Sequence, residues 1–168
     1  PITADTKVEA DEVFGVSLSS VVMLGAGSQA TDVTATDTAT GTIVNDDTAT
    51  LTVADVSQDE NAGTMTFTVT LSADVQNGLT VDYGTASGTA AAGEDFTAST
   101  GTLTFAGTAG ETRTFTVPIT ADSKVEADEV FSVTLSNVVM VDAGSQATDI
   151  TATDTATGTI VNDDTATL

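Results

Sequence analysis

Apolar side chains alternate with threonine along much of this 168-residue chain, and this alternation limits the possible folds more than any other feature. The clearest stretches are 64–71, 79–84, 102–105, 114–120 and 130–136. A period of two places successive side chains on opposite faces of an extended strand, so each stretch predicts a β-strand with one apolar face and one threonine-rich face. Threonine suits such strands because its β-branched side chain fits a half-exposed pleated surface.

The strands are expected to form two packed sheets. A strand around Leu51 and another over 150–160 raise the number to about seven within residues 48–164. Loops rich in Gly, Asp, Asn and Ala separate them, and no segment has the 3.6-residue period of a helix. One apolar face per strand predicts an all-β fold, an antiparallel β-sandwich. Pro118 has no N–H to donate, so its strand is expected at a sheet edge or a bulge.

An internal repeat determines the organisation of the chain. Residues 1–51 and 118–168 are identical at 44 of 51 positions, with a constant offset of 117 and no gap. Such near-identity indicates recent duplication within an array and predicts tandem repeats of period 117. On this interpretation residues 1–47 are the C-terminal part of one repeat, 48–164 are a complete repeat, and 165–168 are the first strand of the next.

The two ends of the chain are out of phase with this repeat. Pro1 corresponds to Pro118, which lies inside a predicted strand, and Leu168 corresponds to Leu51 at the start of another. We therefore interpret the chain as a window of a longer polymer. The alternative is that a partner chain supplies the missing strands. Because no flexible linker separates the predicted repeats, we expect a rigid joint between them.

The charge of the chain limits its partners. It has 25 Asp and Glu against 3 Lys and Arg, a net charge of −22. Such a chain repels nucleic acid and anionic membranes, and no apolar run approaches the ~20 residues of a membrane span. Disorder is the usual alternative for a highly charged chain, but 40% of the residues are hydrophobic and they alternate regularly. Divalent cations are the expected partners.

The residue types that are absent exclude most chemistry. The chain has no Cys, no His and no Trp, and it has one Tyr. Disulfides, thiolate and imidazole metal ligands and a nucleophile activated by a neighbouring base are therefore excluded, so we expect no enzyme. Paired carboxylates alone would suit a glycosidase, but no aromatic sugar-binding cleft can form. The remaining carboxylate, carbonyl and hydroxyl oxygens suit hard cations such as calcium or magnesium.

Acidic residues gather in the loops between the predicted strands. The four groups are Asp59 with Glu60; Glu94 with Asp95; Asp122, Glu126, Asp128 and Glu129; and Asp163 with Asp164. Alternate loops of an antiparallel sandwich return to the same end, so all four groups can meet at one pole. Two carboxylates ~4 Å apart repel by on the order of 4 kcal/mol at an effective dielectric of ~20, and a divalent cation reverses that sign. A solvated acidic surface without an ion is the alternative.

The same segments resemble the Calx-beta repeat, which occurs in sodium–calcium exchangers, in an integrin subunit and in large bacterial surface proteins. The matching motifs are ENAGTMTFTVTLS at 60–72, VDYGTASGTAAAGEDFTASTGTLTF at 81–105, GETRTFTVPITADSKVEADEVFSVTLSN at 110–137 and GTIVNDD at 158–164. The resemblance covers one full repeat and the tail of the preceding copy. It implies a seven-stranded, immunoglobulin-like antiparallel β-sandwich with calcium bound at one pole.

The resemblance also implies a set of calcium ligands. They correspond to Glu60, Asp95, Asp122, Glu126, Glu129, Asp163 and Asp164, and in the preceding partial copy to Asp5, Glu9, Glu12, Asp46 and Asp47. Ala121 and Ser123 flank Asp122 where strong calcium sensors carry an acidic run. Asn162 stands where the terminal run often begins with Asp. This thinner set implies fewer ions or weaker sites.

Together these features predict a structural, fibre- or stalk-forming repeat of a secreted or cell-surface protein of bacterial origin, made rigid by calcium at the repeat junctions. Its expected partners are divalent cations and neighbouring repeats of the same polymer, in a self-assembling or head-to-tail filament. Nucleic acid and membrane insertion are not expected. Two alternatives remain: an adhesive module of a bacterial surface adhesin, and a calcium-sensing regulatory domain, against which the thinner acid set argues.

Overall fold

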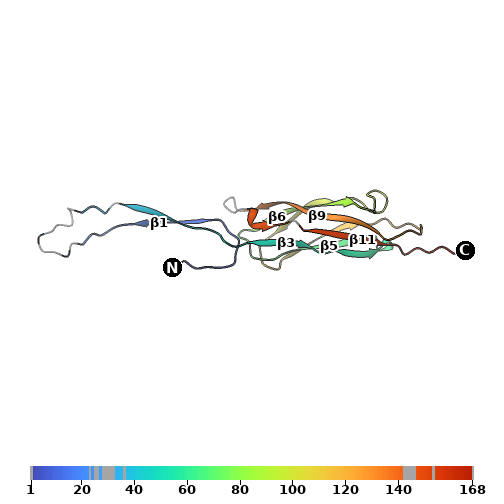
Figure 1. The fold of residues 1–168 in the computed structure, drawn as a ribbon, viewed down its shortest axis with the longest axis horizontal. Coiled ribbons are helices and arrows are strands. Elements are labelled where there is room, and N and C mark those ends of the chain that lie inside the picture. The colour runs from blue at the N-terminus through green and yellow to red at the C-terminus, as the bar shows by residue number, and fades with distance from the viewer. Residues whose placement is uncertain are drawn as a thin grey trace.

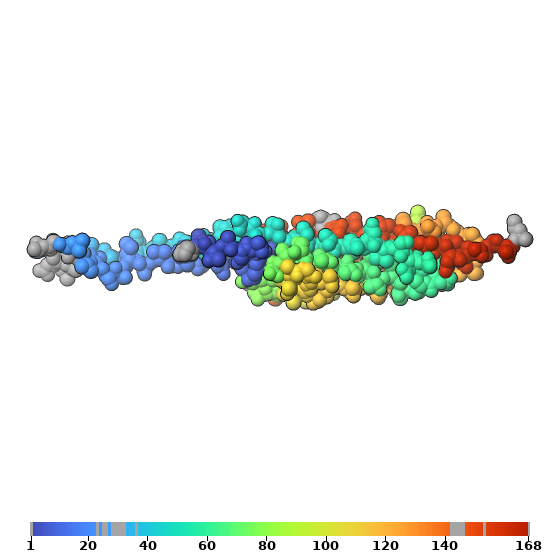
Figure 2. All heavy atoms as spheres, turned by 90° about the horizontal axis from the view of Figure 1, so that it is seen from below, coloured from blue at the N-terminus to red at the C-terminus, as the bar shows by residue number. Residues whose placement is uncertain are grey.

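The structure, a computed structural model, describes residues 2–22, 24, 27, 33–35, 37–141, 147–152 and 154–167. The molecule is elongated (Figure 1, Figure 2). A two-sheet sandwich built from residues 49–161 forms its main body, which confirms the predicted all-β fold. A hairpin of β1 (Glu12–Ser17) and β2 (Thr38–Ile43), called the N-terminal hairpin below, projects from one end.

One sheet of the sandwich has four strands. In spatial order they are β10 (Ile150–Thr151), β3 (Ala49–Val53), β5 (Thr64–Leu71) and β8 (Thr112–Pro118). The β3–β5 and β5–β8 pairs are antiparallel, whereas β10 and β3 run parallel. Pro118 is the last residue of β8, and β8 is an edge strand, as its missing N–H predicts.

The other sheet has five strands. In spatial order they are β4 (Val56–Asp59), β11 (Thr155–Val161), β9 (Glu129–Met140), β6 (Leu79–Ser87) and β7 (Thr100–Phe105). All pairs are antiparallel except β4–β11. Phe131 of β9 lies opposite Gly158 of β11, where an added Cβ would come within 2.4 Å of the Phe131 ring. Because Gly158 has no side chain, the Phe131 ring can lie directly against the backbone of β11.

The first and last strands each cross from one sheet to the other. Two carboxylates accept backbone hydrogen bonds where the strands change sheet. Asp154 Oδ2 accepts the N–H of Val53 at 2.9 Å, and Asp55 Oδ1 accepts the N–H of Thr157 at 2.7 Å. The crossing divides the two strands into β3 with β4 and β10 with β11, so the sandwich has nine described strands where about seven were predicted. The two parallel pairs also correct the expected antiparallel order, because the first and last strands run side by side in the same direction.

The core lies between the two sheets and contains the predicted apolar faces. Phe67 stacks on Phe115 with ring centroids 5.4 Å apart and meets Phe131 edge-on at 5.9 Å. Phe96 was not predicted, because it lies in the β6–β7 connection outside any alternating stretch. Its side chain is fully buried and stacks on Phe131 at 4.4 Å. These rings fix the two sheets against each other.

The N-terminal hairpin has the same register as β9 and β11. Phe14 lies opposite Gly41, as Phe131 lies opposite Gly158. Within the described residues no other strand pairs with the hairpin. Its apolar face therefore stays open. The structure contains one sandwich, so the 117-residue period and the domain limits at 47/48 and 164/165 remain predictions.

Candidate metal site

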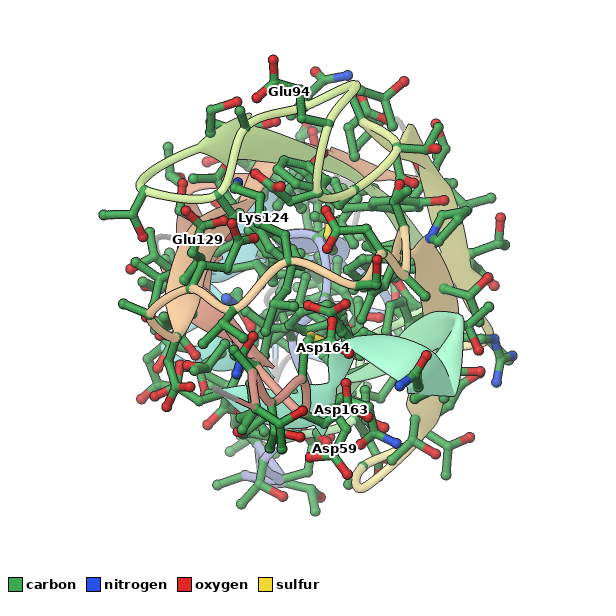
Figure 3. The ribbon with its side chains drawn as sticks, turned by 90° about the vertical axis from the view of Figure 1, so that its right-hand side faces the viewer. Asp59, Glu94, Lys124, Glu129, Asp163 and Asp164 are labelled. Carbon is green, nitrogen blue, oxygen red and sulfur yellow. The ribbon has the colours of Figure 1, made fainter. Side chains whose placement is uncertain are left out.

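Acidic side chains from four segments come together at the end of the sandwich that lies opposite the N-terminal hairpin (Figure 1, Figure 3). This end is called the acidic pole below. The segments are the short 3-10 helix η2 (Glu60–Ala62) that follows β4, the β6–β7 and β8–β9 connections, and the residues after β11. The structure thus brings the predicted loops to one pole, and it arranges six of their carboxylates in two groups of three.

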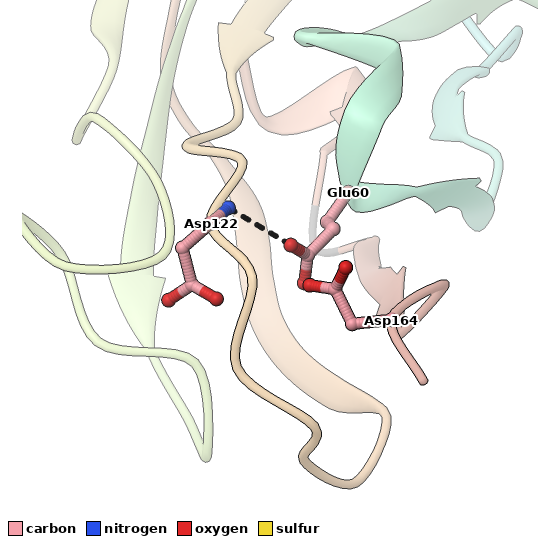
Figure 4. A group of neighbouring side chains, drawn as sticks. All are labelled: Glu60, Asp122 and Asp164. Carbon is pink, nitrogen blue, oxygen red and sulfur yellow. Dashed lines mark hydrogen bonds between the residues drawn. The ribbon is translucent and has the colours of Figure 1, made fainter. Parts of the chain in front are cut away.

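The first group contains Glu60, Asp122 and Asp164, whose nearest carboxylate oxygens lie within 4.8 Å of one another (Figure 4). Glu60 is only 4% exposed, and its Oε1 accepts the N–H of Asp122 at 2.9 Å. Asp164 Oδ2 is buried and has no hydrogen-bond partner among the residues that the structure describes. No ion pair joins either side chain to a residue that the structure describes. Buried carboxylate oxygens without a compensating charge are costly, so this group is suited to a cation.

The second group contains Asp95, Glu126 and Glu129, again with oxygens within 4.8 Å of one another. Asp95 Oδ2 accepts the N–H of Ala91 at 2.7 Å, which fixes its carboxylate. Burial raises the pKa of Glu129 above its ordinary value, and its hydrogen bond with Asp95 and the charges of Asp95 and Glu126 raise it further. The carboxylates therefore repel one another in the folded protein.

Lys124 partly offsets this repulsion. Its ammonium group forms an ion pair with Glu126, and it lies beside the pole in Figure 3. The hydrogen bond to Glu126 and the charge of Glu126 raise the pKa of Lys124, with smaller contributions from Asp122 and Asp95. An incoming cation would have to compete with this side chain for Glu126.

Five of the six grouped carboxylates line one small pocket. Its volume is about 10 Å³, and Glu60, Asp122 and all three residues of the second group line it, together with Thr120, Ala127, Ile160 and Asn162. The volume suits a single ion or water and excludes an organic ligand. Carboxylates dominate the lining, and oxygen donors of this kind suit calcium or magnesium. The residues present thus fit a hard divalent cation.

Some acidic residues of this pole stay outside both groups. Asp163, the seventh predicted ligand of the sandwich, is exposed and accepts a hydrogen bond from Asn61 Nδ2 at 2.6 Å. Asp59 and Glu94 are also exposed, and Figure 3 shows Glu94 far from Asp163 and Asp164. Asp128 accepts the backbone N–H of Asn162 at 3.2 Å and so shapes the loop.

The five predicted ligands near the N-terminus are arranged differently. Asp5, Glu9, Glu12, Asp46 and Asp47 line an open cavity of about 280 Å³ beside the N-terminal hairpin. None of them belongs to a compact group of three within the described part of the chain. Burial, and then the charges of Asp46, Asp5 and Glu9, raise the pKa of Asp47.

Asn162 has a structural role that was not predicted from the sequence. Its Oδ1 accepts the N–H of Glu126 at 3.2 Å, and its Nδ2 donates to the carbonyl of Asp164 at 3.1 Å. It thereby connects two segments that carry predicted ligands. Asn45, the matching residue in the first copy, makes the same bonds to Glu9 and Asp47, at 3.2 and 3.0 Å. The sequence signal that could have revealed this role is the presence of Asn at both positions 45 and 162.

The fold and the site define a class of domain, a β-sandwich with a cluster of carboxylate oxygens at one pole. A sequence profile of the Calx-beta domain matches residues 45–164. This range is most of the chain, so the chain belongs to the Calx-beta domain family.

Solved structures agree with this assignment. The chain is similar to the crystal structure of the apo form of the Calx CBD1 domain, with a TM-score of 0.59 and 26% identity over 70% of this chain and 100% of that one. It is also similar to the crystal structure of CBD12 from CALX1.2, with a TM-score of 0.57 and 27% identity over 68% of this chain and 46% of that one. For the crystal structure of the calcium binding domain CBD12 of CALX1.1, the TM-score is 0.56 and the identity 27%, over 70% of this chain and 47% of that one. The chain thus spans about half the length of the two CBD12 structures. No curated protein matches it significantly.

Proposed function

We propose that the sandwich is a non-catalytic calcium-binding module and that its acidic pole holds the ion. Glu60, Asp122 and Asp164 would form one ligand group, and the second group beside them would add further oxygens. The observation that carries this proposal is the buried Asp164 Oδ2, which lies in one group with the buried Glu60 and has no hydrogen-bond partner in the described part of the chain. The similarity to the calcium binding domain CBD12 of CALX1.1 supports it.

We propose further that calcium here has a structural role in a fibre- or stalk-forming array of such modules on a secreted or cell-surface protein. The near-identity of residues 1–51 and 118–168 supports the array, and the elongated shape in Figure 2 supports its linear form. A bound ion would neutralise the pole where the next module begins and so stiffen the joint. Among the described residues, no helix has the length and apolar character needed to cross a membrane.

A calcium-sensing role is the second candidate, because the similar solved structures are Calx CBD domains. The two roles differ in their response to calcium. A structural module keeps its shape and gains stability, whereas a sensor changes conformation at low-micromolar calcium. Small-angle X-ray scattering with calcium and with chelator distinguishes them. An unchanged maximum dimension supports the structural role, and a changed one supports the sensor.

Thermal unfolding with calcium and with chelator tests calcium binding itself. At about 100 times the Kd, calcium should stabilise the chain by about 2.7 kcal/mol, a shift in Tm on the order of 10 °C. Asp164→Asn should remove most of the shift, because it takes a charge from the ligand group that contains the buried Glu60. Asp47→Asn, the matched change in the first copy, should leave it nearly intact. The proposal is wrong if millimolar calcium does not shift the wild-type Tm.

A further inference from the structure

Val8 joins the N-terminal segment to the sandwich. Its side chain is fully buried and belongs to the sandwich core, although Val8 lies far in sequence from that core. It forms a parallel β-bridge with Val75. Two backbone hydrogen bonds flank the bridge: Val8 N–H donates to the Asp74 carbonyl at 2.9 Å, and Gln76 N–H donates to the Val8 carbonyl at 2.8 Å. The segment is thus held by a specific contact.

The receiving loop is part of the sandwich and is rigidly supported. Val75 N–H donates to the carbonyl of Gly107 at 2.8 Å, and Asp74 Oδ1 accepts the N–H of Ala109 at 2.6 Å. Gly107 has φ +92°, and a Cβ there would lie 2.1 Å from the Val75 carbonyl oxygen, so only glycine fits. We call Asp74, Val75, Gln76 and Gly107 the socket. The bonds of Val75 to Gly107 and of Asp74 to Ala109 lie within the sandwich and do not involve Val8.

A second contact joins the same two parts of the chain. Asn45 Nδ2 donates to Asp149 Oδ2 at 3.1 Å. Asp149 ends the 3-10 helix η3 (Ala147–Asp149), which precedes β10 of the sandwich. Asn45 also holds the Glu9 loop through its Oδ1. The first copy of the acidic segment therefore contacts the following sandwich at two points, Val8 and Asn45.

The opposite end of the sandwich presents the second copy of that surface. Val125 corresponds to Val8 in the repeat but is 53% exposed. Its loop has the same internal bonds: Lys124 N–H donates to Asp122 Oδ1 at 2.6 Å, as Lys7 N–H donates to Asp5 Oδ1 at 3.0 Å. Asn162 holds this loop as Asn45 holds the first. The acidic pole thus already has the conformation that docks at the other end.

We infer that the acidic pole is a docking surface for a further copy of this repeat, with Val125 entering its socket and Asn162 donating to its copy of Asp149. The occupant is a second copy because the complementary socket exists on this sandwich and is seen occupied by Val8. Such a head-to-tail contact does not close on itself, so it extends into a filament. The inference rests on the array part of the proposed function and names the partner of the pole.

A pair of matched substitutions tests the contact in the chain as it is. Val8→Asp should increase the hydrogen-exchange rate of the Gln76 amide by roughly 100-fold, because it expels the segment from the socket. Val125→Asp, the same change in the same local sequence, should leave that rate unchanged. Equal rates for Gln76 in the wild type and in Val8→Asp would show that Val8 does not occupy a specific socket, and would overturn the inference.

A longer chain tests the pole itself. Residues 52–168 are added after Leu168, so that the 117-residue period continues without a linker. The Val125 amide should then exchange roughly 100-fold more slowly than in the 168-residue chain, and Val125→Asp in the longer chain should abolish that protection. Unchanged exchange at Val125, while the core amides of the added copy are protected and show that it is folded, would overturn the inference.

Both exchange experiments are done with calcium and with chelator, which separates this inference from calcium binding. Protection at Val125 in both conditions supports the docking surface even if calcium causes no shift in Tm. A shift in Tm without protection at Val125 supports calcium binding and overturns the docking surface.

Discussion

The N-terminal hairpin and the β9–β11 pair have nearly the same sequence and the same register, but they differ in what surrounds them. Phe14 is 47% exposed and its copy Phe131 is 1% exposed; Val16 is 48% exposed and its copy Val133 is fully buried. In the sandwich, β6 pairs with β9 and β4 pairs with β11, and the hairpin has neither neighbour. The sequence of the two strands therefore determines how they pair with each other. Whether their apolar side chains are buried depends on strands from elsewhere in the chain.

The acidic segments give the same lesson. The loops that contain Lys7 and Lys124 share their internal hydrogen bonds, yet only the second has carboxylates gathered in compact groups within the described residues. The difference comes from Glu60 and Asp95, which only the sandwich supplies.

The largest difference is expected for the paired phenylalanines. Phe131→Ala leaves a cavity beside the rings of Phe67 and Phe96 and should cost about 3–5 kcal/mol of the free energy of unfolding, whereas Phe14→Ala should cost less than about 1 kcal/mol. Urea unfolding followed by the fluorescence of Tyr83, the single tyrosine, reports on the sandwich because Tyr83 stacks on Phe115. Similar costs for the two variants would mean that the hairpin is as well packed as the sandwich.

The paired glycines should show a smaller difference. A Cβ at either Gly158 or Gly41 would come within 2.4 Å of the facing phenylalanine ring. Phe131 is enclosed and cannot move, so Gly158→Ala should cost about 1–3 kcal/mol by overpacking. Phe14 is half-exposed and can swing away, so Gly41→Ala should have little effect in the same urea experiment. A neutral Gly158→Ala would show that the core is looser than described.

The paired glutamates test the electrostatics of the pole. Because the pKa of Glu129 is raised in the folded protein, its ionisation disfavours folding. The stability lost through this ionisation is zero at pH values below the unfolded-state pKa of about 4.5. It grows as pH rises and reaches its full size above the raised pKa of the folded state. In chelator at pH 7, Glu129→Gln should therefore raise Tm by a few degrees and flatten its pH dependence below 7. In calcium the same change should lower Tm.

Glu12→Gln is the control for this inversion, since Glu12 is the exposed copy of Glu129. Its Tm should match the wild type in both conditions. A Glu129→Gln variant that is destabilised in chelator would contradict repulsion among the three carboxylates of the second group.

The paired lysines should show the smallest effect. Lys124 competes with a bound cation for Glu126, so Lys124→Met should tighten calcium binding by roughly 2–5-fold, the range expected for an exposed ion pair. Lys7→Met removes the corresponding pair with Glu9 and should leave the affinity unchanged. Titration calorimetry measures both. Weaker binding after Lys124→Met would show that Lys124 supports the site.

Much of the fold could be predicted from the sequence because its signals are local. The alternation of Met65, Phe67 and Val69 with threonine predicts β5, and Pro118 predicts an edge strand. The sheet crossing could not be predicted, because it depends on hydrogen bonds that Asp55 and Asp154 accept from backbone N–H groups about a hundred positions away. A carboxylate that caps a distant N–H has no periodic signature.

Six of the predicted ligand residues lie in the two acidic groups, but the geometry of these groups could not be predicted. The alternating pattern predicts where strands and loops lie along the chain, and alternate loops of an antiparallel sandwich return to the same end. The burial of Glu60 and the exposure of Asp163 depend on how η2 packs, which the sequence does not encode locally. Val8 illustrates the same limit, since its identical copy Val125 is exposed.

A calcium titration of the ¹⁵N-labelled chain followed by NMR tests the central claim, that surroundings rather than local sequence make the metal site. Calcium should shift the amide signals of Glu60, Asp95, Asp122 and Asp164, and it should leave those of Asp5 and the other N-terminal copies nearly unchanged. Equal shifts at both copies, or no shifts at millimolar calcium, would contradict it.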